Sequence, residues 1–293
     1  MKNIFGEQLT RLRQKKNLSQ QDLAQKLYVS RQSISKWENN EVEPNIDKLI
    51  SLSNIFDVEL DYLITGKKQS KEILLEIHHL SKKFDKEILK DINLSIHSHE
   101  RIALLGSNGS GKSTLAKIIV GETSSSSGYL VQHFNPRNDL SIMPQDNILL
   151  NSYQVEEQIA LSASIQKEYN KNFLSELLSE YNLTEQKKVI ISELSGGQKR
   201  RLSLLIALLK PIKLLILDEP TVGMDLESID FFWKKLELVN TSVLTITHDF
   251  NQIDRYFDRV LLLKEGVIIS DEQVSNIHSN NQTIEKWYRL KNK

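Results

Sequence analysis

The most informative segment of this 293-residue chain is Gly106-Ser107-Asn108-Gly109-Ser110-Gly111-Lys112-Ser113-Thr114. It follows a short apolar run, residues 101–105, and precedes a helical pattern that extends to Val120. Glycines at this spacing let successive backbone N–H groups turn inward around an anion, and the N-terminus of the next helix adds partial positive charge. The segment therefore predicts a phosphate site, where Lys112 reaches the β- and γ-phosphates of a nucleotide and the Ser113 hydroxyl ligates Mg²⁺. The alternative is a glycine turn that only packs a strand on a helix.

The patterns on both sides of this loop predict an α/β domain. Alternating apolar residues indicate half-buried strands before the loop, and continuous apolar runs indicate buried parallel strands after it. A polar helical pattern lies between these regions, and Lys264-Glu265-Gly266 turns a late hairpin. The predicted strands are 73–77, 92–96, 101–105, 214–217, 243–247 and the hairpin 260–269, and the helical segment is 153–185. Strand, glycine loop, helix and further strands separated by helices are typical of a three-layer arrangement.

Two carboxylates end the apolar strand at residues 214–217. Asp218 and Glu219 follow this strand directly. Asp218 is suited to Mg²⁺, and Glu219 to orienting or deprotonating an attacking water molecule. Acidic residues also end many strands for solubility, so this prediction depends on the phosphate loop.

Five further motifs follow the order found in one protein family. They are the signature Leu194-Ser195-Gly196-Gly197-Gln198, Gln145 after Met143-Pro144, the turn Gly223-Met224-Asp225, His248 after Thr247, and Phe84 between Lys83 and Asp85. With the phosphate loop they resemble the ATP-binding cassette (ABC) ATPases, over about residues 72–270. The resemblance implies an α/β P-loop NTPase fold with an antiparallel β subdomain and a helical subdomain. It also implies that the domain binds ATP with Mg²⁺ and hydrolyses the ATP.

The same resemblance implies roles for single residues. Gln145 is the lid glutamine that contacts Mg²⁺ and the attacking water, His248 is the switch histidine on the γ-phosphate, and Asp225 is the D-loop aspartate. Phe84 stacks on adenine, in a place where tyrosine is usual. The signature residues Ser195, Gly196, Gly197 and Gln198 complete the site of another subunit. Working sites therefore require two chains, most simply a homodimer that closes on two ATP molecules.

Composition excludes several classes of protein. The chain has 38 basic residues, 38 acidic residues and no cysteine, which excludes disulfide scaffolds, thiolate metal sites and thiol nucleophiles. The longest apolar region, 202–217, is interrupted by Lys210, Pro211 and Lys213 and falls short of the roughly 20 residues that cross a bilayer. The first residues carry no readable secretory signal, so we expect a cytoplasmic protein.

Residues 1–66 show short amphipathic helices separated by small breaks. Side chains that can cap a helix precede three of them: Ser19, Ser30 and Asn45. The segment from Ser19 to Asn39 resembles the helix-turn-helix of Cro/repressor-type (XRE family) regulators, and the resemblance extends over about residues 3–66. It implies an all-α domain of five helices that binds double-stranded DNA at an operator. Tyr28 and Asn40 stand where glycine is frequent, and asparagine tolerates a left-handed cap.

The second helix of this motif is expected to lie in the major groove, with Ile34 and Trp37 facing the core of the module. Arginine pairs with guanine and glutamine with adenine on their groove edges. The predicted DNA contacts are Arg31 and Gln32 to bases, Lys36 on the same exposed face, and Gln20 and Ser30 to phosphate oxygens.

The charge of the first 66 residues is uneven. Residues 1–36 carry eight basic and two acidic side chains, a net charge of +6, whereas residues 37–66 carry one basic and seven acidic side chains, a net charge of −6. The positive half contains the predicted DNA-facing helices, as phosphate binding requires. The alternative is a helical adaptor whose charge only keeps it in solution.

These motifs and patterns predict four segments in the chain: a helix-turn-helix domain 1–66, a linker 67–71, an ATP-binding and hydrolysing domain 72–270, and a tail 271–293. The polar helical insert from Asn151 onward favours the transporter branch, of export type. One hypothesis is therefore a subunit that powers a separately encoded membrane permease from the inner face of the cell membrane, with a helix-turn-helix that regulates transcription. The alternative is a soluble ATP-switched transcriptional regulator with no transport role. The tail either packs on the cassette or lies near a membrane surface.

Overall fold

The computed structural model describes residues 4–56, 58, 60–66, 72–146, 148–166 and 171–292. The chain divides into two compact units, Met1–Lys71 and Glu72–Lys293. The predicted linker, 67–71, lies outside the described residues. Every helix in the described part of the chain is too short or too polar to cross a bilayer.

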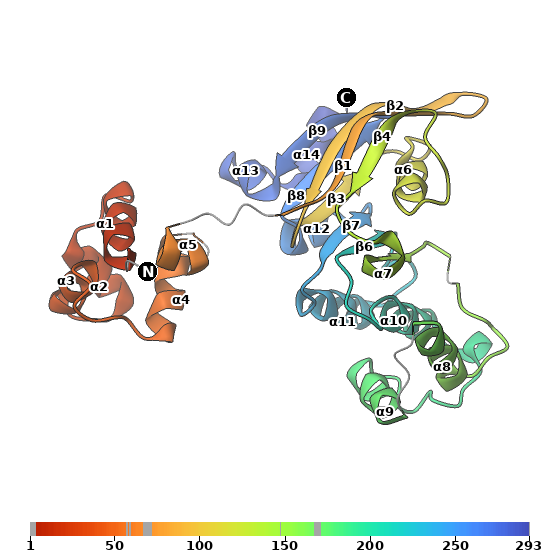
Figure 1. The fold of residues 1–293 in the computed structure, drawn as a ribbon, viewed down its shortest axis with the longest axis horizontal. Helices are drawn as coiled ribbons and strands as arrows, with labels where there is room; N and C mark the ends of the chain where they lie inside the picture. Colours follow the sequence, from red (N-terminus) through yellow and green to blue (C-terminus); the bar gives the residue numbers. More distant parts are fainter. Residues whose placement is uncertain are drawn as a thin grey trace. The chain divides into compact units, whose positions relative to one another are not determined.

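The first unit contains, in its described part, the five predicted helices (Figure 1). They are α1 (Phe5–Lys15), α2 (Gln20–Leu27), α3 (Arg31–Glu38), α4 (Ile46–Phe56) and α5 (Leu60–Thr65). Each helix contributes at least one fully buried aliphatic side chain to a single core: Leu9, Leu23, Leu27, Ile34, Leu52 and Leu63. Because helices this short are marginal alone, this shared core is what stabilises them.

Polar side chains cap these helices as predicted. Ser19 Oγ accepts the backbone N–H of Asp22 at 3.1 Å, and the Asp22 carboxylate accepts the Ser19 N–H at 2.8 Å, which completes a capping box. Ser30 Oγ accepts the Ser33 N–H at 3.1 Å, and Asn45 Oδ1 accepts a first-turn N–H of α4 at 3.0 Å. These bonds set where α2, α3 and α4 begin.

Helices α1 and α3 approach each other closely at Gly6. A Cβ atom there would lie 2.2 Å from the Glu38 carbonyl oxygen, so the position requires glycine. The Gly6 N–H donates to Asn40 Oδ1 at 2.9 Å, and Asn40 itself has a φ of 57°, the left-handed conformation that asparagine tolerates. Beside this contact the Arg13 guanidinium donates to the largely buried Glu38 carboxylate at 2.6 Å. Together these contacts hold α1 against α3.

The second unit contains two sheets among its described residues. A three-stranded antiparallel sheet has the order β2-β1-β4, and a six-stranded sheet has the order β5-β6-β7-β3-β8-β9, in which β9 alone runs antiparallel to its neighbour. The strands are β1 (Ile73–Lys83), β2 (Glu87–His97), β3 (Arg101–Leu105), β4 (Ser127–Gln132), β5 (Leu140–Met143), β6 (Leu214–Asp218), β7 (Ser242–Ile246), β8 (Arg259–Lys264) and β9 (Val267–Gln273).

Helices and the smaller sheet cover the two faces of the six-stranded sheet (Figure 1). The described helices of this unit are α6 (Lys112–Ile119), α7 (Pro136–Asp139), α8 (Val155–Gln166), α9 (Lys171–Glu180), α10 (Gly196–Ala207), α11 (Leu226–Glu237), α12 (Phe250–Tyr256), α13 (Val274–Ser279) and α14 (Ile284–Lys291), of which α9 lies away from the sheet. Along β3, Ile102 and Leu104 pack with the antiparallel sheet and α6, whereas Ala103 and Leu105 pack with α10 and α11. The predicted three-layer α/β fold is therefore confirmed.

The sequence pattern does not predict two of these strands, β4 and β5. No side chain of β4 is fully buried, because this strand lies at the edge of the smaller sheet. The short β5 buries only Met143 completely. An edge strand with little buried surface has no clear apolar alternation, which is the signal that reveals strands such as β3.

The C-terminal segment packs on the cassette. Ile284 and Trp287, on one face of α14, belong to the same core as α10 and α11. The Trp287 Nε1–H donates to Glu272 Oε1 at 3.1 Å. Of the two placements considered for the tail, the structure shows the one against the cassette.

Candidate nucleotide site and recognition helix

The phosphate loop connects β3 to α6. The chain leaves the sheet at Leu105 and enters the helix at Lys112. A Cβ atom at Gly106 would lie 2.3 Å from the Leu263 carbonyl oxygen, and Gly111 has a φ of 108°. Because neither position accepts a larger side chain, glycine keeps the loop close to the sheet and next to the free N–H groups of the first turn of α6.

Lys112 lies inside this loop and is only 7% exposed. Its Nζ donates to the carbonyl oxygens of Gly106 at 2.7 Å and Ser107 at 3.0 Å. Burial lowers the pKa of the Lys112 ammonium, while the neighbouring Glu219 and Asp218 carboxylates raise it. The ammonium is therefore held between the loop carbonyls and two acidic groups.

Ser113 and Asp218 form the next pair. Asp218 is the last residue of β6, and Ser113 lies in the first turn of α6. The Ser113 hydroxyl donates to Asp218 Oδ2 at 3.1 Å. Burial raises the pKa of the Asp218 carboxyl, and the hydrogen bond from Ser113 opposes that rise. A hydroxyl and a carboxylate at this distance are two oxygen ligands of the kind that Mg²⁺ prefers.

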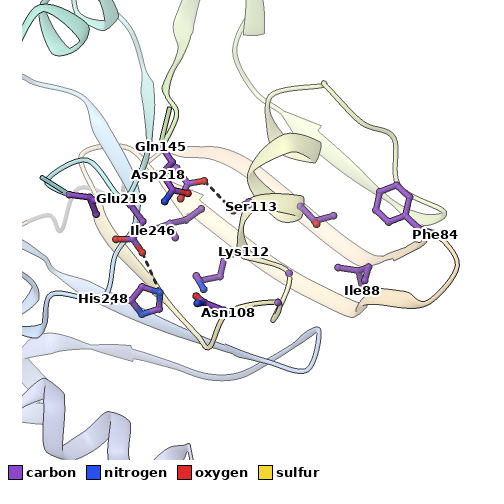
Figure 2. Close-up of a pocket in the computed structure, with 14 residues that line it drawn as sticks. Phe84, Ile88, Asn108, Lys112, Ser113, Gln145, Asp218, Glu219, Ile246 and His248 are labelled. Atoms are coloured by element: carbon purple, nitrogen blue, oxygen red, sulfur yellow. Dashed lines mark hydrogen bonds and ion pairs between the residues drawn. The ribbon is translucent and has the colours of Figure 1, made fainter. Parts of the chain in front are cut away.

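Glu219 and His248 face each other at the ends of adjacent strands. His248 Nε2 lies 3.3 Å from Glu219 Oε1, as Figure 2 shows. Glu219 has a φ of 47°, an unusual value for a residue with a Cβ, and its N–H donates to the Ile246 carbonyl at 2.9 Å. Burial raises the pKa of the Glu219 carboxyl most, and the negative charge of the nearby Asp218 carboxylate raises it further. Burial lowers the pKa of the His248 imidazole most, and the positive charge of the nearby Lys112 ammonium lowers it further.

A cavity of about 790 Å³ collects these groups, with Phe84 and His248 at opposite ends (Figure 2). The predicted residues that line it are Phe84, Asn108, Gly109, Gly111, Lys112, Ser113, Thr114, Gln145, Asp218, Glu219 and His248. Phe84 is 56% exposed, and the Lys82 ammonium lies 4.7 Å from its ring centroid. Ile88, Val222 and Ile246 also line the cavity, and their apolar side chains carry no sequence signal that distinguishes them from core residues. The remaining predicted loop residues, Gly106, Ser107 and Ser110, lie in the loop but outside the cavity lining.

The predicted signature residues do not line this cavity. Ser195 caps α10, its Oγ accepting the Gln198 N–H at 3.2 Å, and Ser195 and Gly196 are exposed. Asp225 caps α11. A Cβ atom at Gly197 would lie 2.6 Å from Ser228 Oγ, so the start of α10 is packed directly on α11. The start of α10 and Asp225 therefore pack against each other outside the lining of the cavity in the same chain.

The recognition helix α3 exposes the predicted face. Arg31, Gln32 and Lys36 are exposed, whereas Ile34 and Trp37 are buried, as predicted. The two predicted phosphate contacts already have partners within the unit. Gln20 Nε2 donates to Glu38 Oε2 at 2.8 Å, and the Ser30 hydroxyl caps α3. The Gln20 amide nitrogen carries a second N–H, which can still donate to a phosphate oxygen.

Comparisons with known proteins find a family match in each of the two units. A family model described as ABC transporter matches residues 89–222, and one described as helix-turn-helix matches residues 9–63. A Bacillus cereus protein, named for an ABC transporter ATP-binding protein, is 31% identical over 254 residues, which cover 80% of this chain and 45% of that protein. The chain spans about half the length of the bacterial relatives that it matches.

Solved structures share the fold of the cassette. CbiO1 of Clostridium perfringens, part of the ABC transporter complex cbiONQ, is 26% identical with a TM-score of 0.63, over 76% of this chain and 98% of that one. An ATP-binding cassette in a dimeric post-hydrolysis state with ADP and Pi is 21% identical with a TM-score of 0.60, over 69% of this chain and 99% of that one. The chain therefore carries a helix-turn-helix domain followed by an ATPase domain of the ABC transporter family.

Proposed function

We propose that this chain hydrolyses ATP as the motor subunit of a transporter and binds DNA through its first unit. The observation that carries the ATPase proposal is the single cavity that collects a lysine, a hydroxyl and carboxylate pair, and a carboxylate and imidazole pair. In it, adenine stacks on Phe84, and the phosphates lie along the loop from Gly106 to Thr114. The spread from Phe84 to His248 accommodates an extended nucleotide (Figure 2).

The residues present fit Mg²⁺. In the described residues no group of three or more histidine and acidic side chains is arranged to hold a metal ion. Mg²⁺ commonly takes one or two protein oxygen ligands and completes its shell with phosphate oxygens and water. Ser113 and Asp218, with Gln145 at the rim of the cavity, would hold it. When bound, the ion neutralises charge on the β- and γ-phosphate oxygens.

Glu219 and His248 act on the water and the γ-phosphate. Because burial raises its pKa, the Glu219 carboxylate is a stronger base than an exposed glutamate and suits orienting or deprotonating the attacking water. Because burial lowers its pKa, His248 is neutral at pH 7 and keeps one ring N–H for a γ-phosphate oxygen. Lys112 stabilises the charge that builds up on the β- and γ-phosphates.

The working unit is a homodimer. Ser195, Gly196, Gly197 and Gln198 lie outside the cavity of their own chain, at the exposed N-terminus of α10. A helix N-terminus with free N–H groups suits the γ-phosphate bound by a second chain. An isologous dimer would place each signature over the other chain's nucleotide, with Asp225 beside it. The dimeric relative captured with ADP and Pi supports this arrangement.

A membrane permease is the proposed partner, in an export-type transporter. A cavity of about 190 Å³ beside Gln145 is lined by Pro144, Ile148 and Ile206, and Ile148 is 73% exposed. The lining also includes Ser141, Gln158 and Ser203, and a groove that combines exposed isoleucine with polar side chains fits a cytoplasmic helix of a permease. The relative CbiO1 is itself part of a transporter complex. This partner would hold the chain at the inner face of the cell membrane.

The first unit would read an operator and regulate transcription. The exposed face of α3 carries Arg31 and Gln32 for base edges and Lys36 for the backbone, and the basic half of the unit supplies phosphate attraction. The Ser30 hydroxyl and the second amide N–H of Gln20 are the proposed phosphate-side contacts, because a phosphate oxygen accepts hydrogen bonds. The limits 1–66 for this domain, 72–270 for the cassette and 271–293 for the tail belong to the same proposal.

Purified full-length protein tests both halves. We expect Mg²⁺-dependent ATP hydrolysis, an ATP-dependent dimer in the Glu219→Gln variant, and sequence-specific retention of DNA taken from upstream of neighbouring transport genes. Absence of hydrolysis in the wild-type protein would overturn the ATPase proposal. Hydrolysis that is never stimulated by a membrane protein, and no co-purifying membrane partner, would count against transport.

A soluble ATP-switched regulator is the second candidate, because both sites lie in one chain. Dimer closure on ATP would reset the spacing of two recognition helices and so change operator affinity. Operator binding by the Glu219→Gln variant should then differ with and without ATP. Equal affinities would eliminate this candidate and leave the transport role.

A further inference from the structure

Arg200 is a buried cation that no proposed catalytic role uses. It lies in α10, two residues after the signature, and is 5% exposed. Its Nη1 donates to the Pro144 carbonyl oxygen at 3.1 Å, and its Nη2 donates to the Gln145 carbonyl oxygen at 2.5 Å. A buried charge is costly unless it is hydrogen-bonded, and the planar guanidinium fork suits two successive carbonyl groups. These bonds attach the signature helix to the segment that carries the lid glutamine.

The basic neighbours of Arg200 have different partners. Lys199 Nζ donates to the Ser192 carbonyl oxygen at 3.2 Å, and Arg201 Nη2 reaches Ser228 Oγ at 3.4 Å. Adjacent positions on a helix point about 100° apart, so each side chain contacts a different element. Among these three cations, Arg200 is the one that contacts the Gln145 segment.

The segment that Arg200 holds has left the sheet. β5 ends at Met143, and Gln145 is exposed at the rim of the nucleotide cavity. Its side chain therefore depends on contacts outside the strand ladder for its position. α10, in contrast, is a continuous helix of 12 residues whose first turn is fixed by the Ser195 and Gln198 capping box. Through its two carbonyl bonds, Arg200 therefore fixes the Gln145 segment relative to this helix.

We propose that Arg200 is a positioning residue that couples the two ATP sites of the dimer. The inference rests on the proposed function, in which Gln145 serves its own chain's nucleotide and Ser195 serves the partner's nucleotide. When Ser195 docks on the partner's γ-phosphate, α10 moves as one body, and the two carbonyl bonds carry Gln145 into place. ATP bound at one site thereby positions Gln145 at the other site.

Full-length variants test this coupling. Arg200→Gln and Arg200→Lys should lower kcat by about 2- to 150-fold, the range expected when a contact of roughly 0.5–3 kcal/mol within one network is lost. The Hill coefficient for ATP should fall toward 1, and ATP affinity in the Glu219→Gln background should stay within about twofold. The lysine variant, which keeps the charge and one donor group, should lie between the wild type and Arg200→Gln. Lys199→Met is the matched control, because Lys199 also donates to a carbonyl but not on the Gln145 segment.

A double-mutant cycle separates positioning from simple structural support. If Arg200 acts through Gln145, Gln145→Ala/Arg200→Gln should hydrolyse ATP at the rate of Gln145→Ala alone. Effects that multiply, or an unchanged Hill coefficient in both Arg200 variants, would overturn the inference. Melting temperatures identify a variant that fails to fold, in which case the cycle is run with Arg200→Lys. If the wild-type chain hydrolyses no ATP, the proposed function fails; if it does and the effects multiply, this inference alone fails.

Discussion

The cavity of the second unit takes its side chains from positions as far apart as Phe84 and His248, whereas the exposed face of α3 carries Arg31, Gln32 and Lys36 within six residues. The cavity depends on parallel strands β6 and β7, which end at the same edge of one sheet and bring Asp218 and His248 together. The helix needs only its own periodicity to place three side chains on one face. The proposed chemistry on phosphate thus depends on tertiary structure, and the proposed DNA contact depends on a local surface.

Burial of charge separates the two regions further. In the cavity, burial shifts the pKa values of Lys112, Asp218, Glu219 and His248 away from their ordinary values. In the first unit, the buried charges are the Arg13 and Glu38 pair, which join α1 to α3 rather than face a ligand. Buried charge therefore lines a cavity in one region and joins two helices in the other.

The strongest test of this contrast is Glu219→Gln. Loss of the base should lower kcat for ATP hydrolysis by about 10²- to 10⁴-fold, because glutamine cannot accept the proton from water. Operator affinity measured without nucleotide should not change, since the cavity and the helix use separate side chains. Glu227→Gln, at an exposed glutamate of α11, is the control and should hydrolyse ATP normally. Equal losses in both variants would contradict a specific role for Glu219.

Arg31→Ala tests the other region. Loss of one bidentate base contact should raise the operator Kd by about 5- to 150-fold, which corresponds to roughly 1–3 kcal/mol. ATP hydrolysis should remain at the wild-type rate. Arg11→Ala removes an exposed basic residue of α1 outside the recognition helix and should weaken binding less, and equally for all DNA sequences. If both variants bind DNA equally, Arg31 provides charge only.

The pH dependence of hydrolysis should reveal the buried carboxylate. Burial raises the pKa of Glu219 above its ordinary value of 4.5, so the proton-accepting form is lost at a higher pH than for an exposed glutamate. The rate should fall as pH is lowered through this raised pKa, approaching tenfold per pH unit below it. The residual activity of Glu219→Gln should lack this acid limb. An acid limb that persists in this variant would assign the titration to another group.

Tyr28→Gly should give the smallest effect, and it acts on stability. Tyr28 has a φ of 52°, a left-handed conformation that strains the backbone. Its side chain is 92% exposed, so burial does little to offset this strain. Glycine relieves a strain of roughly 1–2 kcal/mol but adds about 0.5–1 kcal/mol of unfolded-state entropy, so a gain of up to about 1.5 kcal/mol remains. Hydrogen exchange of the Leu9, Leu23 and Leu63 amides measures this gain in the first unit. Asn17→Gly, at a φ of 54°, should gain less because asparagine tolerates this conformation.

Local rules explain which parts of the chain can be predicted. Ser19 and Ser30 reveal where helices begin, since a cap bonds to residues two or three positions away. The phosphate loop is recognisable because its glycines allow, within nine residues, a backbone conformation that larger residues cannot adopt. β4 and β5 are not predictable in this way, because their place in the sheets comes from partners far along the chain, Leu75 to Ser81 for β4 and the β6 residues for β5.

The sequence by itself determined the two domain types, the phosphate loop, the signature and the exposed face of α3, because each depends on residue types at short, fixed spacings. Only the tertiary structure decided that Gln20 serves Glu38, that Trp287 joins the cassette core, and that Arg200 holds the Gln145 segment. Those contacts join residues 18 to more than 50 positions apart, or depend on which face of a helix is buried. Pairings of this kind are set by how the elements pack, and no short pattern of residues encodes them.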